Sequence, residues 1–320
     1  MTTGTSLRHT PARAPDRLRP ARKGRRGHGD RALFGRFRYG YVAPGALVVA
    51  GLLYLPFLWT VYLSFTNYDG LSPATWAGLS NYRQLLHDPA LLTAIRNTLI
   101  WVVGTTLLPV GLGLLVAMLS YNIKGGTWLR LPFLLPYAFS GAGIGLVWGV
   151  LLSPGGTLNQ VLGFLHLPGA HTPLLSYAPV NTIVLIIAMT WQQIGVNTLL
   201  FVVGLQSIPR DPIEAARIDG ASGWSLFRHV IWPLLSPLTT VVVGLALVAS
   251  LKTFDVVWVA TQGGPGRSSE TLAVTMYRDT FVANEYGYGS AVAVLLTVVT
   301  GVVSVIYLRQ QLSRREGLSG

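Results

Sequence analysis

The sequence contains no cysteine and few charged residues. Without cysteine, the chain can form no disulfide and carries no thiol chemistry. Asp, Glu, Lys and Arg make up only 11% of the 320 residues, whereas hydrophobic residues make up 51%. Soluble domains carry roughly 25% charged residues. These shortages exclude a disulfide scaffold and argue against a soluble globular protein.

The motifs of common enzymes are also missing. The sequence has no Gly-x4-Gly-Lys-Ser/Thr loop for phosphate, no His-Glu-x2-His zinc motif and no Gly-x-Ser-x-Gly nucleophile motif. The six histidines show no metal-ligand spacing. We therefore expect no enzyme, and no cofactor or metal in this chain. If the protein uses ATP, another subunit must hydrolyse it.

Long apolar runs are what the sequence has in place of these motifs. About 20 apolar residues in a helix cross a hydrocarbon core of about 30 Å. Six runs meet this requirement, and they predict an all-α, polytopic membrane protein. The predicted spans cover about 41–65, 98–119, 129–152, 180–205, 234–260 and 289–308.

Positive charge is concentrated at the N-terminus. Residues 1–38 hold eleven Arg or Lys and two Asp, so they carry +9 of the net charge of +12. Six spans place both termini on one side, and the positive-inside rule predicts that this side is cytoplasmic. We expect 1–38 and 311–320 to be cytoplasmic tails, the first of them disordered. A nucleic-acid-binding arm is the alternative for the basic tail.

The segment 209–233 is the longest amphipathic stretch between the apolar runs. Asp211 is predicted to cap a helix, with Pro212 at the first helical position and Glu214 at the third. Gly220 can adopt the left-handed conformation that ends a helix. The pattern therefore predicts a short helix that stops at a glycine hinge.

A second short helix is expected to start near Ser222. Trp224, Phe227 and Ile231 recur at helical spacing, and Pro233 marks the return to apolar sequence. One alternative is a hairpin packed on its own protein. A DNA-binding helix-turn-helix is disfavoured because the charges of the loop balance. The basic residues are Arg210, Arg217 and Arg228, and the acidic residues are Asp211, Glu214 and Asp219.

The loop resembles the EAA loop of ABC-importer permease subunits, the part that contacts the cytoplasmic ATPase. A leucine is usual in that family where this chain has Trp232. The resemblance implies that the ATPase-coupling residues are Glu214, Ala215, Ala216, Asp219, Gly220, Ala221, Phe227 and Pro233. It covers about 41–309 and implies the type I ABC-importer permease fold in a bacterial cell membrane.

The same resemblance implies a set of partners. They are a second homologous permease, two ATPase subunits that bind ATP and Mg, and an extracytoplasmic solute-binding protein that meets loops such as 263–267. No nucleic acid is expected among them. The ATPase would move the loop as a lever and switch the spans between inward-open and outward-open cavities.

Polar residues inside the predicted fifth span are candidates for a solute path. Charged residues near a bilayer centre cost about 3 kcal/mol on insertion scales, so they usually face protein or water. Lys252 and Asp255 are three residues apart and are expected on one helical face. They either pair with each other or line a polar path.

The stretch 251–266 resembles the carbohydrate branch of the permease family. Amide and hydroxyl side chains suit sugar hydroxyls, and aromatic rings suit pyranose faces. Interhelical hydrogen bonding is the alternative role for each residue alone. The candidate substrate-path residues are Gln192, Gln193, Asn197, Ser250, Thr253, Asp255 and Trp258.

An ion-gradient-driven secondary transporter is the alternative function. Such a protein needs inverted repeats and usually a relay of acidic residues within its spans. Asp255 is the only acidic residue in the predicted spans. The sequence therefore favours the ATP-driven importer.

Overall fold

The computed structural model describes residues 43–316, and the predicted basic tail lies outside these residues. The chain divides into two compact units, Met1–Leu55 and Pro56–Gly320. In the list that follows, η marks a 3₁₀ or π turn. The elements are η1 (Ala50–Tyr54), α2 (Leu55–Leu63), α3 (Ser80–His87), α4 (Pro89–Tyr121), α5 (Gly126–Leu134), η2 (Leu135–Ala138), α6 (Gly141–Leu151), α7 (Thr157–Phe164), η3 (Leu174–Ser176), α8 (Val180–Ser207), α9 (Arg210–Ile218), α10 (Gly223–Leu226), η4 (Phe227–Ile231), α11 (Trp232–Leu251), α12 (Asp255–Thr261), α13 (Leu272–Tyr277), η5 (Arg278–Val282) and α14 (Tyr286–Glu316).

The all-α prediction is confirmed for the described residues, which contain helices and one isolated β-bridge. Five helices are long and apolar enough to cross a membrane, and a sixth span exists if a bent pair counts as one. Gly126–Ala138 and Gly141–Leu151 form that pair and meet at 95°. The five unbroken spans are Ala43–Leu63, Pro89–Tyr121, Val180–Ser207, Gly223–Leu251 and Tyr286–Gln311.

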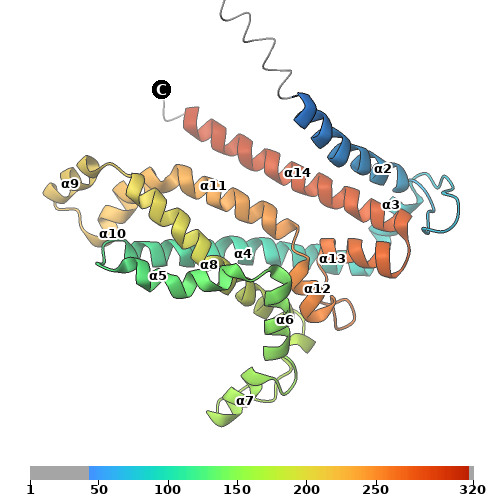
Figure 1. The fold of residues 1–320 in the computed structure, drawn as a ribbon, viewed down its shortest axis with the longest axis horizontal. Coiled ribbons are helices and arrows are strands. Elements are labelled where there is room, and N and C mark those ends of the chain that lie inside the picture. The colour runs from blue at the N-terminus through green and yellow to red at the C-terminus, as the bar shows by residue number, and fades with distance from the viewer. Residues whose placement is uncertain (1–42, 317–320) are drawn as a thin grey trace, which may run out of the picture. The chain divides into compact units, whose positions relative to one another are not determined.

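Helices α4 and α8 pack along each other in the second unit. A side chain on Gly113 of α4 would meet the Asn197 Cβ at 2.6 Å and the Thr198 nitrogen at 3.0 Å, so glycine permits this close crossing. Helix α11 contributes Leu235 and Val242 to the same apolar core. Figure 1 shows α9 at one end of this bundle and α13 near the other.

The predicted third span is broken where α5 and η2 give way to α6. The Ser140 hydroxyl caps α6 by accepting a hydrogen bond from the Gly143 nitrogen. Across the bundle, the Gln192 amide donates to the Phe139 carbonyl at 2.6 Å. This bond satisfies a carbonyl that leaves the helix at the bend, as a buried backbone group requires.

The predicted fifth span is broken as well, which the sequence interpretation did not expect. Helix α11 ends at Leu251, and α12 begins at Asp255 after three non-helical residues. The expectation that Lys252 and Asp255 share one helical face is therefore wrong. These two described residues also form no ion pair with each other. A helix brings positions i and i+3 together, and this segment lacks the helix.

Helices α6 and α12 lie against each other through a row of glycines. Side chains on Gly141, Gly145 and Gly149 would meet Asp255, Val256 and Ala260, respectively, at 3.0–3.3 Å. These glycines of the third span thus permit close helix packing, as small residues do in membranes. The row brings the bend in one broken span beside the break in the other.

Two polar segments between the predicted spans contain buried helices. The stretch 67–96 holds α3 and the first turns of α4, and 261–288 holds α13 and η5. Buried apolar residues of both segments share one core with α14. Composition alone did not reveal this burial, because the polar side chains of these segments bond to one another inside the fold.

Candidate functional site

A polar cavity of about 180 Å³ lies where the two broken spans meet α4 and α8. Four of the seven candidate path residues line it: Gln193 of α8, Ser250 of α11, Thr253 of the break and Asp255 of α12. The sequence separates them by as many as 62 positions, from 193 to 255. Ser250 lies in the last turn of α11, and the break that follows this helix brings Thr253 and Asp255 to the same space.

Charged and apolar groups complete the cavity. Lys252 lines it with Asp255, and both side chains are exposed. Met189 and Phe254 supply apolar surface, and Thr105 supplies a hydroxyl. Such a mixture can offer hydrogen-bond donors and acceptors to a hydroxyl-rich solute and an apolar wall to its carbon face. Thr105 was not among the predicted path residues. Lys252 was expected either to pair with Asp255 or to line a polar path, and it lines the cavity.

Three candidate path residues lie elsewhere, each with a partner inside the fold. Gln192 holds the carbonyl of Phe139, and Asn197 donates to the Gln193 carbonyl of its own helix at 3.0 Å. Trp258 packs on Tyr277 with ring centroids 4.8 Å apart. For these three, the interhelical or packing role is the better interpretation.

The position of the cavity along the bundle follows from α4. Thr105 lines the cavity, and Asn97 lies eight residues earlier, about 12 Å along a helix. Tyr121, beside the predicted coupling loop, lies sixteen residues later, about 24 Å away. The cavity is therefore within the apolar length of the bundle, nearer the end that holds α13.

The segment Ser268–Leu272, which we term the anchor segment, ties several helices together at that end. The Asn97 amide donates to the carbonyls of Ser268 and Glu270 at 2.7 and 2.9 Å, and the Thr98 hydroxyl accepts from the Leu272 nitrogen at 3.0 Å. Asn181 of α8 donates to the Ser268 hydroxyl at 3.0 Å. Sequence reasoning missed this segment because its partners lie about 90 and 170 positions away.

An ion cluster surrounds the buried carboxylate of Glu270. Arg267 donates to it at 2.9 Å, and the Arg278 Nε lies 2.6 Å from its other oxygen in an orientation that makes no hydrogen bond. Arg267 also contacts Asp279 at 3.2 Å. Burial raises the pKa of Asp279 to about 6, although the charge of Arg267 opposes the rise.

The first helix of the predicted coupling loop begins two residues earlier than expected. Helix α9 runs from Arg210 with Pro209 at the cap position, so the prediction that Asp211 caps it is wrong. Asp211 lies in the first turn, where the helix dipole favours a negative charge. Proline at 209 fixes the turn into the helix and takes the place expected for the aspartate.

The end of α9 is as predicted. Gly220 has a φ of +87°, its nitrogen donates to the Arg217 carbonyl at 3.1 Å, and the Ala221 nitrogen donates to the Ala216 carbonyl at 2.8 Å. These two bonds are the Schellman pattern. The second short helix starts after Ser222 but continues through η4 into α11, so it is the first part of the fifth span and not a separate unit.

The predicted coupling residues are mostly accessible. Glu214, Ala215, Asp219, Gly220 and Pro233 are exposed, and Ala216, Ala221 and Phe227 are half-buried. A cavity of about 290 Å³ next to α9 is lined by Glu214 and by the basic side chains of Arg210 and Arg217. The loop thus presents small and charged groups on an open surface.

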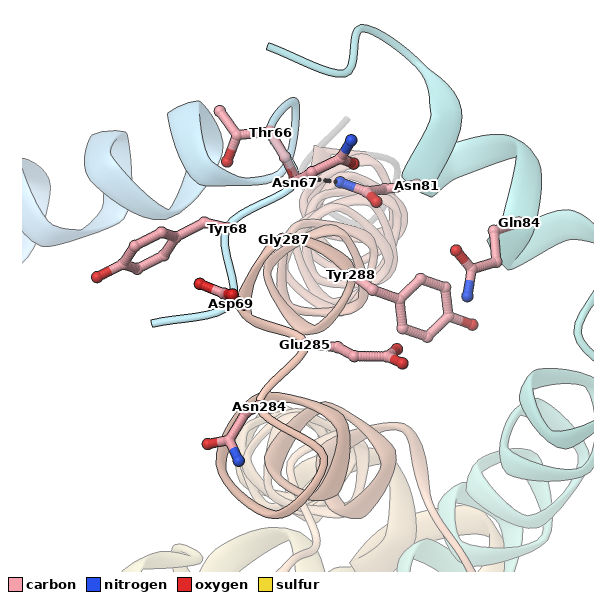
Figure 2. A pocket seen from close by; sticks show the side chains of 10 residues that line it. All are labelled: Thr66, Asn67, Tyr68, Asp69, Asn81, Gln84, Asn284, Glu285, Gly287 and Tyr288. Carbon is pink, nitrogen blue, oxygen red and sulfur yellow. Dashed lines mark hydrogen bonds between the residues drawn. The ribbon is translucent and has the colours of Figure 1, made fainter. Parts of the chain in front are cut away.

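A third cavity lies near the start of α14 and holds none of the predicted site residues. It measures about 230 Å³, and its lining is rich in amide, carboxylate and hydroxyl groups. Figure 2 shows Glu285 and Tyr288 pointing to the same side, whereas Tyr68 points away. The cavity is lined by Thr66, Asn67, Tyr68, Asp69, Asn81, Gln84, Asn284, Glu285, Gly287 and Tyr288.

A family described as the binding-protein-dependent transport system inner membrane component matches residues 109–317. The chain belongs to this family. It is therefore a membrane-embedded permease component of an ABC importer and not an enzyme. The match includes the predicted coupling loop and the whole cavity wall formed by α8, α11 and α12.

Curated relatives agree with this family over most of the chain. The multiple sugar-binding transport system permease protein of Streptococcus mutans is 34% identical, over 80% of this chain and 88% of its own. The sn-glycerol-3-phosphate transport system permease protein of Brucella abortus is 33% identical, over 85% and 93%. A probable ABC transporter permease protein of Pyrococcus horikoshii is 34% identical, over 84% and 93%.

A solved structure shares the fold. A chain of a bacterial ABC transporter that imports the acidic polysaccharide alginate superposes with a TM-score of 0.76 and covers 90% of this chain and 98% of its own. Its sequence identity is 19%. A second match is the same kind of transporter in complex with a periplasmic protein that holds an alginate pentasaccharide. These matches support the permease fold for the described bundle.

Proposed function

We propose that this chain forms the membrane path for a sugar or sugar-like solute in an ATP-driven importer. The observation that carries the proposal is the cavity where Gln193, Ser250 and Thr253 converge within the apolar length of the bundle. Amide and hydroxyl side chains can replace the water around sugar hydroxyls. The relatives named for multiple sugars and for glycerol 3-phosphate support this class of solute.

The loop 209–233 couples this path to an ATPase subunit that binds ATP and Mg. Helix α9 has nine residues and is about 13 Å long, long enough to seat in a groove and transmit a rigid-body rotation. The exposed Glu214 offers a carboxylate to a basic partner residue, and the alanines let two surfaces approach closely. In this proposal the loop and both termini are cytoplasmic, in the cell membrane of a bacterium.

The assembly contains a second homologous permease, two ATPase subunits and an extracytoplasmic binding protein. The binding protein meets the end of the bundle that holds 263–267 and α13, opposite to α9. The periplasmic partner in the alginate transporter complex supports this arrangement. ATP binding then drives the exchange between inward-open and outward-open forms of the cavity.

Co-purification with candidate ATPase subunits, followed by solute-stimulated ATP hydrolysis with the cognate binding protein, tests the proposal. Glu214→Lys should abolish most of the stimulation and leave membrane insertion intact. Arg309→Glu, an exposed charge change on α14 outside both the coupling loop and the proposed binding-protein surface, is the matched control for coupling. Failure of the chain to bind any ATPase subunit, or full stimulation of Glu214→Lys, would overturn it.

A further inference from the structure

We propose that Thr271 is a positioning residue for the solute cavity. Its hydroxyl holds the broken part of the fifth span in the shape that presents Thr253 and Asp255 to the cavity. This inference rests on the proposed function, because it assigns the cavity to the solute. Thr271 itself does not line the cavity and is only 1% exposed.

The hydroxyl of Thr271 makes two bonds at once. It donates to the Thr253 carbonyl at 2.7 Å and accepts from the Val274 nitrogen at 3.4 Å, which caps α13. A threonine hydroxyl has one hydrogen to donate. That hydrogen is committed to Thr253, so the bond links the start of α13 to the cavity wall.

The Thr253 carbonyl needs a partner of this kind. Thr253 lies outside both α11 and α12. The first bond of α12 runs from the Trp258 nitrogen to the Phe254 carbonyl, so among the described backbone contacts the Thr253 carbonyl has no helical donor. A broken helix at membrane depth is tolerated when its freed backbone groups are satisfied by neighbouring protein. Thr271, which does not line the cavity, supplies the donor for Thr253.

Thr271 is held in place from two further helices. The other residues of the anchor segment bond to Asn97 and Thr98 of α4 and to Asn181 of α8, and Asn97 and Asn181 are both fully buried. The position of the Thr271 hydroxyl is therefore fixed by α4 and α8. Through it, the Thr253 carbonyl is fixed relative to Gln193 of α8, which also lines the cavity.

Loss of this bond should change solute affinity more than transport capacity. Without the donor, the 252–254 segment relaxes, and Thr253 and Asp255 no longer meet the solute in their original geometry. Thr271→Val removes the hydroxyl and keeps the shape. Thr271→Ser keeps both bonds. Thr280→Val is the matched control, since the Thr280 hydroxyl is buried and bonds only to the Met276 carbonyl of its own helix among the described contacts.

The first measurement uses the absence of cysteine from the chain. Ala249→Cys places a single thiol in the cavity lining, and its labelling rate by a membrane-impermeant maleimide reports the shape of the neighbouring segment. We expect Thr271→Val to change this rate at least threefold, and Thr271→Ser and Thr280→Val to leave it unchanged. The rate does not depend on knowing the solute.

The second measurement is uptake of a panel of radiolabelled sugars and glycerol 3-phosphate by vesicles that contain the full transporter. For the solute that is taken up, Thr271→Val should raise the half-saturating concentration about tenfold, as expected when a buried carbonyl loses its hydrogen bond. The maximal rate should fall less than twofold. Thr271→Ser should restore the original affinity.

A lowered melting temperature with unchanged labelling and unchanged half-saturation would overturn the proposal, because Thr271 would then only cap α13. If Thr271→Val fails to reach the membrane, Thr271→Ala removes the same donor and is judged by the same readouts. Absence of uptake of every solute by the parent protein would count against the proposed function. The labelling result would still decide the role of Thr271.

Discussion

The anchor segment and the α9–α10 loop are both polar in sequence, yet they have opposite surroundings. In the anchor segment, Glu270 is 0% exposed and Thr271 is 1% exposed, and their polar groups bond within the chain. In the loop, Ile218 is 87% exposed and Trp224 is 71% exposed. The polar groups of the anchor segment find their partners within the chain, whereas the α9–α10 loop exposes large apolar side chains at the surface.

Burial distinguishes residues that stabilise the fold from residues that contact partners better than composition does. Exposed apolar side chains grouped with polar ones mark surfaces that meet partners. Buried polar groups that bond within the chain mark positions where a substitution damages the fold itself. The comparison therefore predicts stability losses at the anchor segment and coupling losses at the loop.

The largest effect is expected for Glu270→Gln. The substitution leaves Arg267 and Arg278 without the buried carboxylate that they share, and breaking a buried ion pair in this way costs about 3–5 kcal/mol. Thermal unfolding in detergent should show a large drop in melting temperature. Glu214→Gln, in the exposed loop, should stay within about 0.5 kcal/mol of the parent. Equal losses of stability at Glu270 and Glu214 would contradict the distinction between the two regions.

Gly220→Val should lower coupling in the loop. At a φ of +87°, a β-branched residue is strained by about 1–2 kcal/mol, so the end of α9 would rearrange. ATP hydrolysis should lose its response to solute while membrane insertion is retained. Gly220→Asn, which tolerates the left-handed conformation, should keep most of the response. If Val and Asn behave alike, the glycine is not a hinge.

The pH dependence of stability sharpens the comparison at Asp279. Its pKa is about 6 in the folded protein against an ordinary value of 3.8, so the folded state holds the proton more tightly between these values. The free energy of unfolding should therefore fall as pH rises from about 4 to about 6, and this contribution should level off above that. Melting temperatures of Asp279→Asn and the parent, compared across this window, should diverge in favour of the variant. Parallel curves would contradict the assignment.

The smallest effect is expected within helix α8, where one residue lines the cavity and another packs inside the bundle. Gln193 lines the cavity, whereas Asn197, one turn later, is 6% exposed and packs against α4. Gln193→Ala should raise the half-saturating concentration for uptake about fivefold, which is the loss of roughly one hydrogen bond. Asn197→Ala should change the melting temperature more than the uptake affinity. A larger change in uptake affinity than in melting temperature for Asn197→Ala would indicate that Asn197 lines the solute path.

Much of the fold was predictable because local patterns determine it. Apolar runs located the spans, and the conformational freedom of Gly220 located the end of α9. The cap of α9 was misassigned, because Asp211 and Pro209 both suit the entry to a helix and spacing alone does not separate them. The break of the fifth span was not predicted, whereas Pro132 and Pro136 indicate a kink in the third span.

The site was predicted only in part, because the positions of its residues depend on tertiary structure. Thr253 and Asp255 reach the cavity beside Ser250 of α11 because the chain leaves the helix at residues 252–254. An unbroken helix would have directed Asp255 differently. Trp258 looked equally suitable in sequence, but Tyr277 and Phe254 enclose it. The roles of the predicted coupling residues remain predictions, since they depend on a partner.

Cysteine cross-linking tests the central claim most directly. Ala215→Cys gives the chain a single thiol on the exposed face of α9, and Ala283→Cys gives one on an exposed residue at the opposite end. With a short bifunctional thiol reagent and the co-purified ATPase subunit, the account predicts a cross-linked product for Ala215→Cys that changes in yield on ATP binding, and none for Ala283→Cys. A cross-link through residue 283, or none through residue 215 in an assembled complex, would contradict it.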